Sequence, residues 1–308
     1  MSKIIITCAV TGSIHTPSMT PHLPITAEEI TDEAVAAAQA GASVLHLHAR
    51  DPINGRPTAL AEHFMAFLPR IKQASDAVVN ITTGGSATMT LDDRLAAPMV
   101  AEPEMCSLNM GSMNFALYPA AQKISDWKYD WEKPFLEGSE DLVFKNTPRD
   151  IAYVVTEMGE KRGARFEFEC YDLSHLYMLR HFADRGLVKP PVFLQTIFGA
   201  MGGIGPDIDN LIFMKRTADR LLGDDFVWSV LGAGRFQFGL VTTGAIMGSH
   251  VRVGLEDNLY IGPGELAKSN ADQVAKIKRI LGELSLEAAT PDETRTMLGL
   301  KGGDRVKF

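Results

Sequence analysis

The segment Gly41-Ala-Ser-Val-Leu-His-Leu-His-Ala-Arg-Asp-Pro52 holds a short apolar run that ends in two histidines. Alternate residues of a strand point to the same face, so His46 and His48 would present both imidazoles at the carboxyl end of one strand. Two converging imidazoles suit a transition-metal site. Two histidines hydrogen-bonded in a polar pocket are the alternative. The choice between these interpretations depends on the residues at the ends of the other strands.

Strand-like and helical segments alternate along the rest of the chain. The predicted strands cover residues 4–8, 43–48, 77–82, 105–109, 164–170, 191–196, 226–231 and 251–255. The predicted helices cover residues 26–41, 59–74, 90 onward, 147–163, 174–186, 208–222, 236–247, 272–284 and 291–298. This alternation predicts a (β/α)8 TIM barrel. An open doubly wound sheet is less favoured, because no Gly-x-Gly-x-x-Gly follows the first strand.

Residues 118–145 depart from this alternation and are rich in aromatic and charged residues, among them Trp127 and Trp131. We expect a single barrel domain over residues 1–308 in which this segment is an extended loop or lid, a subunit interface, or both. Exposed aromatic residues at this density favour burial against another subunit. The segment therefore predicts a homo-oligomer.

The composition is that of an ordinary soluble globular protein, with 45% hydrophobic and 22% charged residues. A net charge of -8 argues against nucleic acid as the main partner. No apolar run reaches the roughly 18 residues of a membrane span, and the apolar stretch at the start of the chain is too short for a signal peptide. Cys8, Cys106 and Cys170 lack the spacing of a metal motif. We expect free thiols and a cytoplasmic location.

Polar and ionisable residues stand at the ends of the predicted strands, where barrels of this kind build their sites. Glu256 is the expected third metal ligand, because the eighth strand closes the barrel against the first, beside the second. Two imidazoles and one carboxylate leave coordination positions open; zinc is the first expectation, and iron(II) uses the same ligands. The alternatives are a helix cap at Glu256 and Asp257, and an internal ion pair between Arg252 and Asp257.

Two glycine-containing loops and one histidine are candidate ligand contacts. Thr82-Thr-Gly-Gly85 is either a tight turn or a set of hydroxyl and amide donors for a carboxylate. In the loop after the seventh strand, small residues and amides at Gly232, Gly234 and Arg235 would suit a phosphate at a helix N-terminus. His15, after the first strand, faces either the substrate or the surface.

Two long segments carry a family resemblance. Residues 41–52 and His250-Val-Arg-Val-Gly-Leu-Glu-Asp-Asn-Leu-Tyr260 resemble the signature segments of the beta-keto acid cleavage enzymes. Residues 82–85, 105–115 and 298–302 add to the resemblance, which runs from the first strand to the end and is weakest over residues 118–145. It implies a (β/α)8 barrel that holds one zinc ion through His46, His48 and Glu256, and a homodimer or homotetramer.

The reaction implied by this resemblance uses acetyl-CoA as cosubstrate and converts a beta-keto acid into acetoacetate and a new acyl-CoA. The resemblance assigns proton transfer to Arg252, Asp257 and Glu169. It assigns substrate contacts to Thr82, Gly85 and Ser107. A free arginine holds its proton too tightly to act readily as a base, so we expect Asp257 or Glu169 to accept the proton.

One position departs from the family pattern. Members that act on an amino substrate carry a glutamate in the first loop, near where this chain has Ile14 and His15. We therefore expect a substrate side chain without positive charge, whether aliphatic, hydroxylated or anionic. Two other functions stay open: a metal-dependent hydrolase in which zinc activates water, and a non-catalytic barrel that binds a metabolite.

Overall fold

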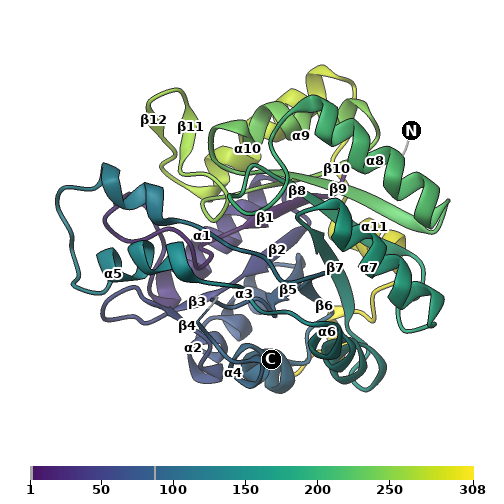
Figure 1. The fold of residues 1–308 in the computed structure, drawn as a ribbon, viewed down its shortest axis with the longest axis horizontal. Helices are drawn as coiled ribbons and strands as arrows, with labels where there is room; N and C mark the ends of the chain where they lie inside the picture. Colours follow the sequence, from purple (N-terminus) through teal and green to yellow (C-terminus); the bar gives the residue numbers. More distant parts are fainter. Residues whose placement is uncertain (1–2, 87) are drawn as a thin grey trace.

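The computed structural model describes residues 3–86 and 88–308. Parallel strands close into a barrel in the order β1-β10-β9-β8-β7-β6-β5-β2 (Figure 1). Their bounds are β1 (Ile6–Ala9), β2 (Val44–Leu47), β5 (Val78–Thr82), β6 (Met105–Asn109), β7 (Arg165–Cys170), β8 (Val192–Phe198), β9 (Phe226–Gly232) and β10 (His250–Val253). The predicted (β/α)8 barrel is confirmed.

Helices surround the barrel and bury their apolar faces against it. Threonine caps begin several of them: the side chains of Thr26, Thr90, Thr147 and Thr290 each accept a hydrogen bond from the third residue of the helix, which returns one from its own side chain. The bounds are α1 (Ala27–Ala40), α4 (Leu91–Ala101), α6 (Pro148–Val154), α7 (Leu173–Asp184), α8 (Ile208–Leu222), α9 (Gln237–Ile246), α10 (Asn270–Glu283) and α11 (Pro291–Leu298).

Two predicted helices differ from the structure. Residues 59–74 form two short helices, α2 (Ala61–Met65) and α3 (Leu68–Ala74). Pro69 explains the break, because proline lacks an amide proton and is tolerated only in the first turn of a helix. The helix predicted over residues 147–163 is α6 followed by a π-helical turn, Val155–Glu160.

Two hairpins were not predicted. They are β3 (Ala49–Arg50) with β4 (Pro57–Thr58), and β11 (Tyr260–Gly262) with β12 (Glu265–Leu266). Strands of two or three residues are too short to show a period in the sequence. The hairpins follow β2, which contains His46 and is followed by His48, and β10, which precedes Glu256. The helix-cap alternative for Glu256 and Asp257 is therefore wrong, because a hairpin follows them.

The segment of residues 118–145 packs over the barrel mouth, at the left of Figure 1. It contains two 3-10 turns (Tyr118–Lys123 and Gly138–Asp141) and α5 (Glu132–Glu137). The indole of Trp131 donates to the carbonyl of Asn54 in the β3–β4 hairpin (3.0 Å) and packs edge-to-face on Phe135. The predicted exposure of these aromatic rings is wrong for Trp131, which is half-buried within the chain. The homo-oligomer stays a prediction.

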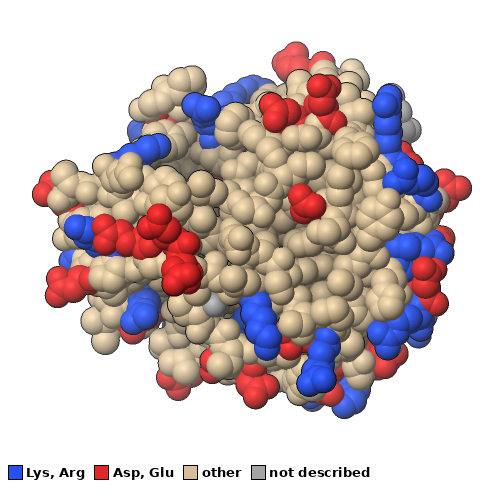
Figure 2. All heavy atoms as spheres, viewed as in Figure 1, with Lys and Arg blue, Asp and Glu red and all other residues tan. Residues whose placement is uncertain are grey.

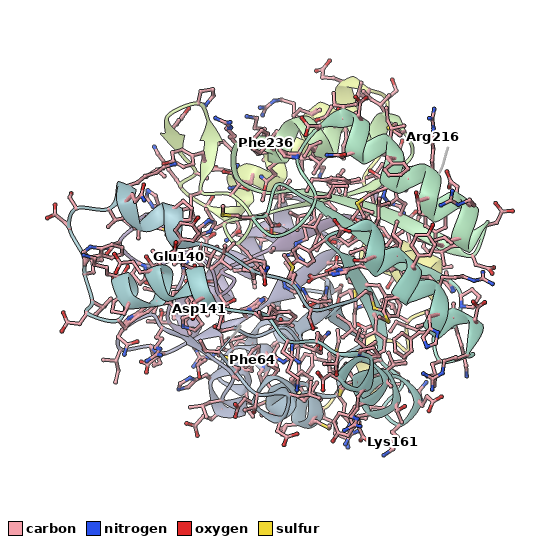
Figure 3. All side chains as sticks on the ribbon, viewed as in Figure 1. Phe64, Glu140, Asp141, Lys161, Arg216 and Phe236 are labelled. Atoms are coloured by element: carbon pink, nitrogen blue, oxygen red, sulfur yellow. The ribbon has the colours of Figure 1, made fainter. Side chains whose placement is uncertain are left out.

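Charged side chains are scattered over the periphery in the view of Figure 2, around a largely uncharged central area. Among the labelled side chains of Figure 3, Lys161 and Arg216 lie at the edge of the molecule, whereas Phe64 of α2 is buried. Across the described ranges, none of the helices combines the length and the apolar character needed to cross a membrane.

Candidate active site

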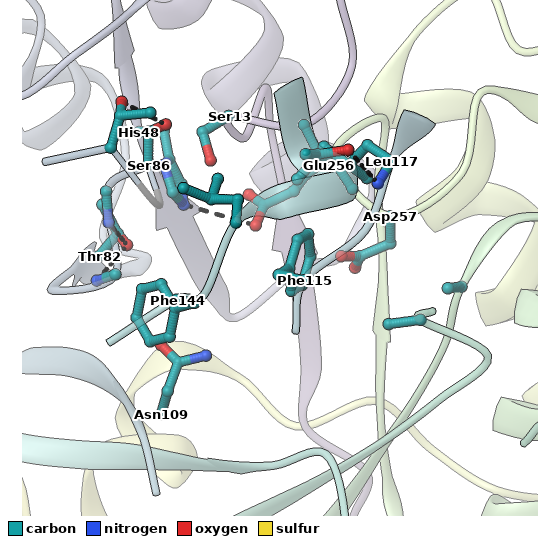
Figure 4. Close-up of a pocket in the computed structure, with 18 of the residues that line it drawn as sticks. Ser13, His48, Thr82, Ser86, Asn109, Phe115, Leu117, Phe144, Glu256 and Asp257 are labelled. Carbon is teal, nitrogen blue, oxygen red and sulfur yellow. Dashed lines mark hydrogen bonds and ion pairs between the residues drawn. The ribbon is translucent and has the colours of Figure 1, made fainter. Parts of the chain in front are cut away.

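A cavity of about 420 Å³ opens at the carboxyl ends of the barrel strands (Figure 4). Ionisable side chains from β2, β7 and the turn after β10 lie at its base. The segment of residues 118–145, the loop before it and the first loop supply most of its apolar wall. That wall comprises Ile14, Phe115, Leu117, Trp131, Phe135, Leu142 and Phe144.

The three predicted metal ligands meet at the base of this cavity. The Nε2 atoms of His46 and His48 lie 3.4 and 3.5 Å from Oε1 of Glu256. One donor atom from each residue lies within 4.8 Å of the other two. The barrel closure brings them together, because β1 pairs with β10 on one side and with β2 on the other.

The chemistry of these donors fits a divalent transition metal. Burial lowers the pKa of His46 to about 4, so its imidazole is neutral and keeps a lone pair for a metal. Oε2 of Glu256 is buried and has no hydrogen-bond partner among the described residues. Two nitrogen donors and one carboxylate are a ligand set that zinc and iron(II) both use, with coordination positions left for a substrate.

Arg252 is the electrostatic centre of the site. Its guanidinium binds Asp257 through two hydrogen bonds of 3.0 Å and Glu256 at 2.9 Å. Its Nη1 also donates to Glu169 at 3.1 Å and to Glu167 at 3.2 Å. All five side chains are buried. The predicted ion pair of Arg252 with Asp257 is thus one part of a larger cluster.

The cluster favours carboxylates as the proton acceptors. Burial raises the pKa of Asp257 to about 7 and also raises the pKa of Glu169, although Arg252 opposes both shifts. Burial alone would lower the pKa of Arg252, but its carboxylate partners outweigh burial and hold that pKa well above its usual value. Arg252 therefore keeps its proton near neutral pH. Four buried carboxyl groups surround one arginine, and a bound cation would stabilise their ionised forms.

The predicted substrate contacts Thr82 and Gly85 both line the cavity. The hydroxyl of Thr82 accepts hydrogen bonds from the amides of Gly84 (3.0 Å) and Gly85 (3.2 Å), so these donors stabilise a tight turn. Ser107 pairs with Thr82 in register on the neighbouring strand and is buried. It is not among the residues that line the cavity, whereas Asn109, two residues further along β6, is.

The predicted first-loop contact lies behind the cavity wall. Nδ1 of His15 donates to the carbonyl of Leu255 at 2.8 Å, and burial lowers the pKa of His15 to about 4. The adjacent Ser13 and Ile14 line the cavity, and His15 is not among the lining residues. The position that departs from the family pattern therefore presents an uncharged wall.

In the loop after β9, two amides that a phosphate could use are already bound to carbonyls. The amide of Ala233 donates to the carbonyl of Phe198 (2.9 Å), and the amide of Gly234 donates to that of Asp257 (2.8 Å). The guanidinium of Arg235 stacks on Phe236. Of residues 232–235, Ala233 lines the cavity; Gly232, Gly234 and Arg235 do not.

Sequence reasoning missed most of the apolar wall and one buried acid. Phe115, Leu142 and Phe144 lie in irregular segments, which show no periodicity from which a shared surface could be inferred. Glu167 carried a usable signal, because it precedes Glu169 by two residues and shares its face of β7. Tyr171, just after β7, lines the cavity and places its hydroxyl 3.4 Å from Glu169.

Comparison with known proteins agrees with these features. The family model of the beta-keto acid cleavage enzymes matches residues 3–300. A "3,5-dioxohexanoate:acetyl-CoA acetone transferase" of Paraburkholderia graminis is 58% identical over 99% of this chain and 98% of its own length. A "3-keto-5-aminohexanoate cleavage enzyme" of Acetoanaerobium sticklandii is 36% identical over 97% of this chain and 99% of its own.

Among solved structures, the apo form of ObcA superposes with a TM-score of 0.68 at 21% identity. The match covers 91% of this chain and 66% of ObcA, and supports the barrel fold. The family match and the sequence identities together establish that this chain belongs to the beta-keto acid cleavage enzyme family.

Proposed function

We propose that this protein cleaves an uncharged-side-chain beta-keto acid of the 3,5-dioxohexanoate type, with acetyl-CoA as cosubstrate. The observation that carries the proposal is the 58% identity, over nearly the whole of both chains, to the transferase named for that substrate. Relatives named for amino or trimethylamine substrates are 36% and 31% identical. The uncharged wall at Ile14 supports the same choice of substrate.

The carboxylates of the cavity already have partners, which also disfavours a cationic substrate. The acidic residues that line the cavity are Glu169, Glu256 and Asp257, and each of them accepts a hydrogen bond from Arg252. Glu256 is also a proposed metal ligand, so a substrate ammonium group would find no carboxylate on the described wall that is not already bound to Arg252 or reserved for the metal. Leaving such a charge partly desolvated is unfavourable, whereas a ketone or methyl group is accommodated by the aromatic wall.

We propose that His46, His48 and Glu256 hold one zinc ion. Bound there, the metal would supply Lewis-acid stabilisation to the oxygens of the keto acid. Asp257 is the proposed acceptor of the proton from the carbon between the two carbonyls, with Glu169 as its neighbour in the same cluster. A base works best when its pKa lies near the working pH, and the pKa of Asp257 is about 7.

Arg252 has a different part in this proposal. It keeps its proton and orients both carboxylates, so it holds the proton acceptor at a constant position and offsets negative charge as it develops. Thr82 and Asn109 offer polar side chains to the substrate carboxylate on the same side of the cavity. Gly85 permits the turn that places Thr82, and Ser107 supports Thr82 from the neighbouring strand.

The overall exchange balances without an oxidant or reductant. The bond between the second and third carbons of the keto acid breaks, and the second carbon gains the acetyl group of acetyl-CoA. The released acyl group takes the CoA sulfur. For 3,5-dioxohexanoate the products are acetoacetate and acetoacetyl-CoA.

A substrate panel tests the proposal. Purified protein is incubated with acetyl-CoA and 3,5-dioxohexanoate, a 5-amino-3-keto acid or 3-oxoadipate, and the new acyl-CoA is measured by mass. We expect the highest kcat/KM with 3,5-dioxohexanoate and no turnover without acetyl-CoA. A higher kcat/KM with the 5-amino-3-keto acid would refute the proposed specificity. Turnover without acetyl-CoA would favour the metal-dependent hydrolase. In a separate experiment, His48→Ala removes a proposed metal ligand and should abolish bound metal and turnover together.

We further propose a homodimer or homotetramer that works in the cytoplasm. Ile208 and Phe213 of α8 and Ile246 of α9 are more than half exposed, a cost that burial between subunits would remove. Cys8, Cys106 and Cys170 are buried free thiols, as is usual in a reducing compartment. Light scattering of the purified protein tests the assembly, and a monomeric mass would refute it.

A further inference from the structure

A fully buried carboxylate lies in the barrel interior beneath the proposed metal centre. Glu167 stands on β7 two residues before Glu169, so both side chains point into the barrel. The relative exposure of Glu167 is 0%. Barrel interiors of this fold are usually filled by branched apolar side chains, so a carboxylate at this depth requires a reason.

Three strands supply hydrogen bonds that hold this carboxylate in one orientation. Nδ2 of Asn80, on β5, donates to its Oε2 at 2.9 Å, and Nη1 of Arg252, on β10, donates to the same oxygen at 3.2 Å. Nε2 of Gln195, on β8, donates to Oε1 at 3.3 Å. A buried acid bound by two carboxamides and one guanidinium has a position set by the whole barrel.

His46 lies across the barrel from Glu167 and has one ring nitrogen engaged at the site. Its Nε2 faces Glu256, at 3.4 Å. Its Nδ1 is buried without a hydrogen-bond partner among the described residues and lies 3.9 Å from Oε2 of Glu167. An imidazole that presents Nε2 to a metal carries its proton on Nδ1, and that proton needs an acceptor.

We infer that Glu167 is a positioning residue for the proposed metal centre: it accepts a hydrogen bond from Nδ1–H of His46 and thereby fixes the tautomer and orientation of that ligand. The 3.9 Å separation exceeds a direct hydrogen bond by less than 1 Å, which a small rotation of the imidazole closes. The same carboxylate anchors Nη1 of Arg252 beside Glu169. The inference rests on the proposed metal site.

The test compares Glu167→Gln with a matched control, Glu104→Gln. Glu104 is also buried and arginine-bound, through two hydrogen bonds of 2.9 Å from Arg295, but it precedes β6 at the other end of the barrel. Zinc affinity is measured by competition with a chromophoric chelator, and the ligand field by the visible spectrum of the cobalt(II)-loaded protein. We expect E167Q to weaken zinc affinity about 10- to 100-fold and to change the cobalt spectrum, since loss of a partner of a metal-bound histidine has that cost.

The control and the remaining outcomes separate the inference from its basis. E104Q should keep the wild-type zinc affinity even where its unfolding midpoint falls. If E167Q does not fold, Glu167→Asp keeps the carboxyl group but withdraws it from His46 by about one methylene, and weaker zinc binding is again expected. Wild-type affinity and an unchanged cobalt spectrum in either folded variant would overturn the role of Glu167 and leave the metal site standing. Absence of zinc binding by the wild-type protein would instead refute the proposed metal site.

Discussion

Substitution of Gly12 by alanine should disable the proposed metal site from the first loop. Gly12 has a φ of +61°, and an added Cβ would lie 2.3 Å from Cγ of Glu256 and 2.9 Å from its Cβ and Cδ. Because ordinary contact begins near 3.4 Å, Glu256 must retreat by about 1 Å. Metal–ligand distances deviate from their usual values by only about 0.2 Å. We expect G12A to lose more than about 100-fold in zinc affinity, since mutation of residues that only hydrogen-bond to a metal ligand already costs about 10- to 100-fold.

Gly186 provides the matched control. Its φ is +72°, and an added Cβ would meet nothing within 4 Å. G186A therefore carries a similar left-handed backbone strain, about 1 kcal/mol, without touching the site. Zinc affinity is measured by chelator competition, and the free energy of unfolding by urea titration of the metal-free proteins. If G12A binds zinc like the wild type and loses no more stability than G186A, a side chain at residue 12 does not displace Glu256 from a metal site, and the reasoning fails.

Three further results are expected. Asp257→Asn should lower kcat about 100-fold or more and abolish the rise of kcat with pH near 7, measured by initial rates across pH, because Asp257 accepts a proton only when ionised. Ile14→Glu should raise kcat/KM for a 5-amino-3-keto acid about tenfold relative to 3,5-dioxohexanoate in a competition assay, since it supplies a carboxylate for the ammonium group; an unchanged ratio would contradict the assigned wall position. Burial lowers the pKa of His250 to about 4, so the unfolded state binds more protons between pH 4 and 6.5, and stability is lost as pH falls through that window. The free energy of unfolding is measured by urea titration at pH 7 and at pH 4. Between these pH values His250→Asn should lose about 3 kcal/mol less than the wild type, and an equal loss in both proteins would refute the assignment.

The sequence by itself determined the order of the elements and the pair of metal-site imidazoles. Short apolar runs and the helical segments between them are local signals, and the strand and helix order they predict agrees with the barrel. His46 and His48 share a face because any strand places alternate residues there. Glu256 was predictable once a closed barrel was assumed, since closure requires the last strand to pair with the first.

Only the tertiary structure decided the electrostatics and the walls of the site. Arg252 collects Glu167, Glu169, Glu256 and Asp257 from β7 and the turn after β10, and the resulting pKa values depend on burial that no local pattern reports. The loop containing Gly234 suggested a phosphate site, and only the fold shows that the amide of Gly234 is bound to the carbonyl of Asp257. Secondary structure follows from neighbours along the chain, whereas desolvation, hydrogen-bond satisfaction and cavity shape depend on groups that only folding brings together.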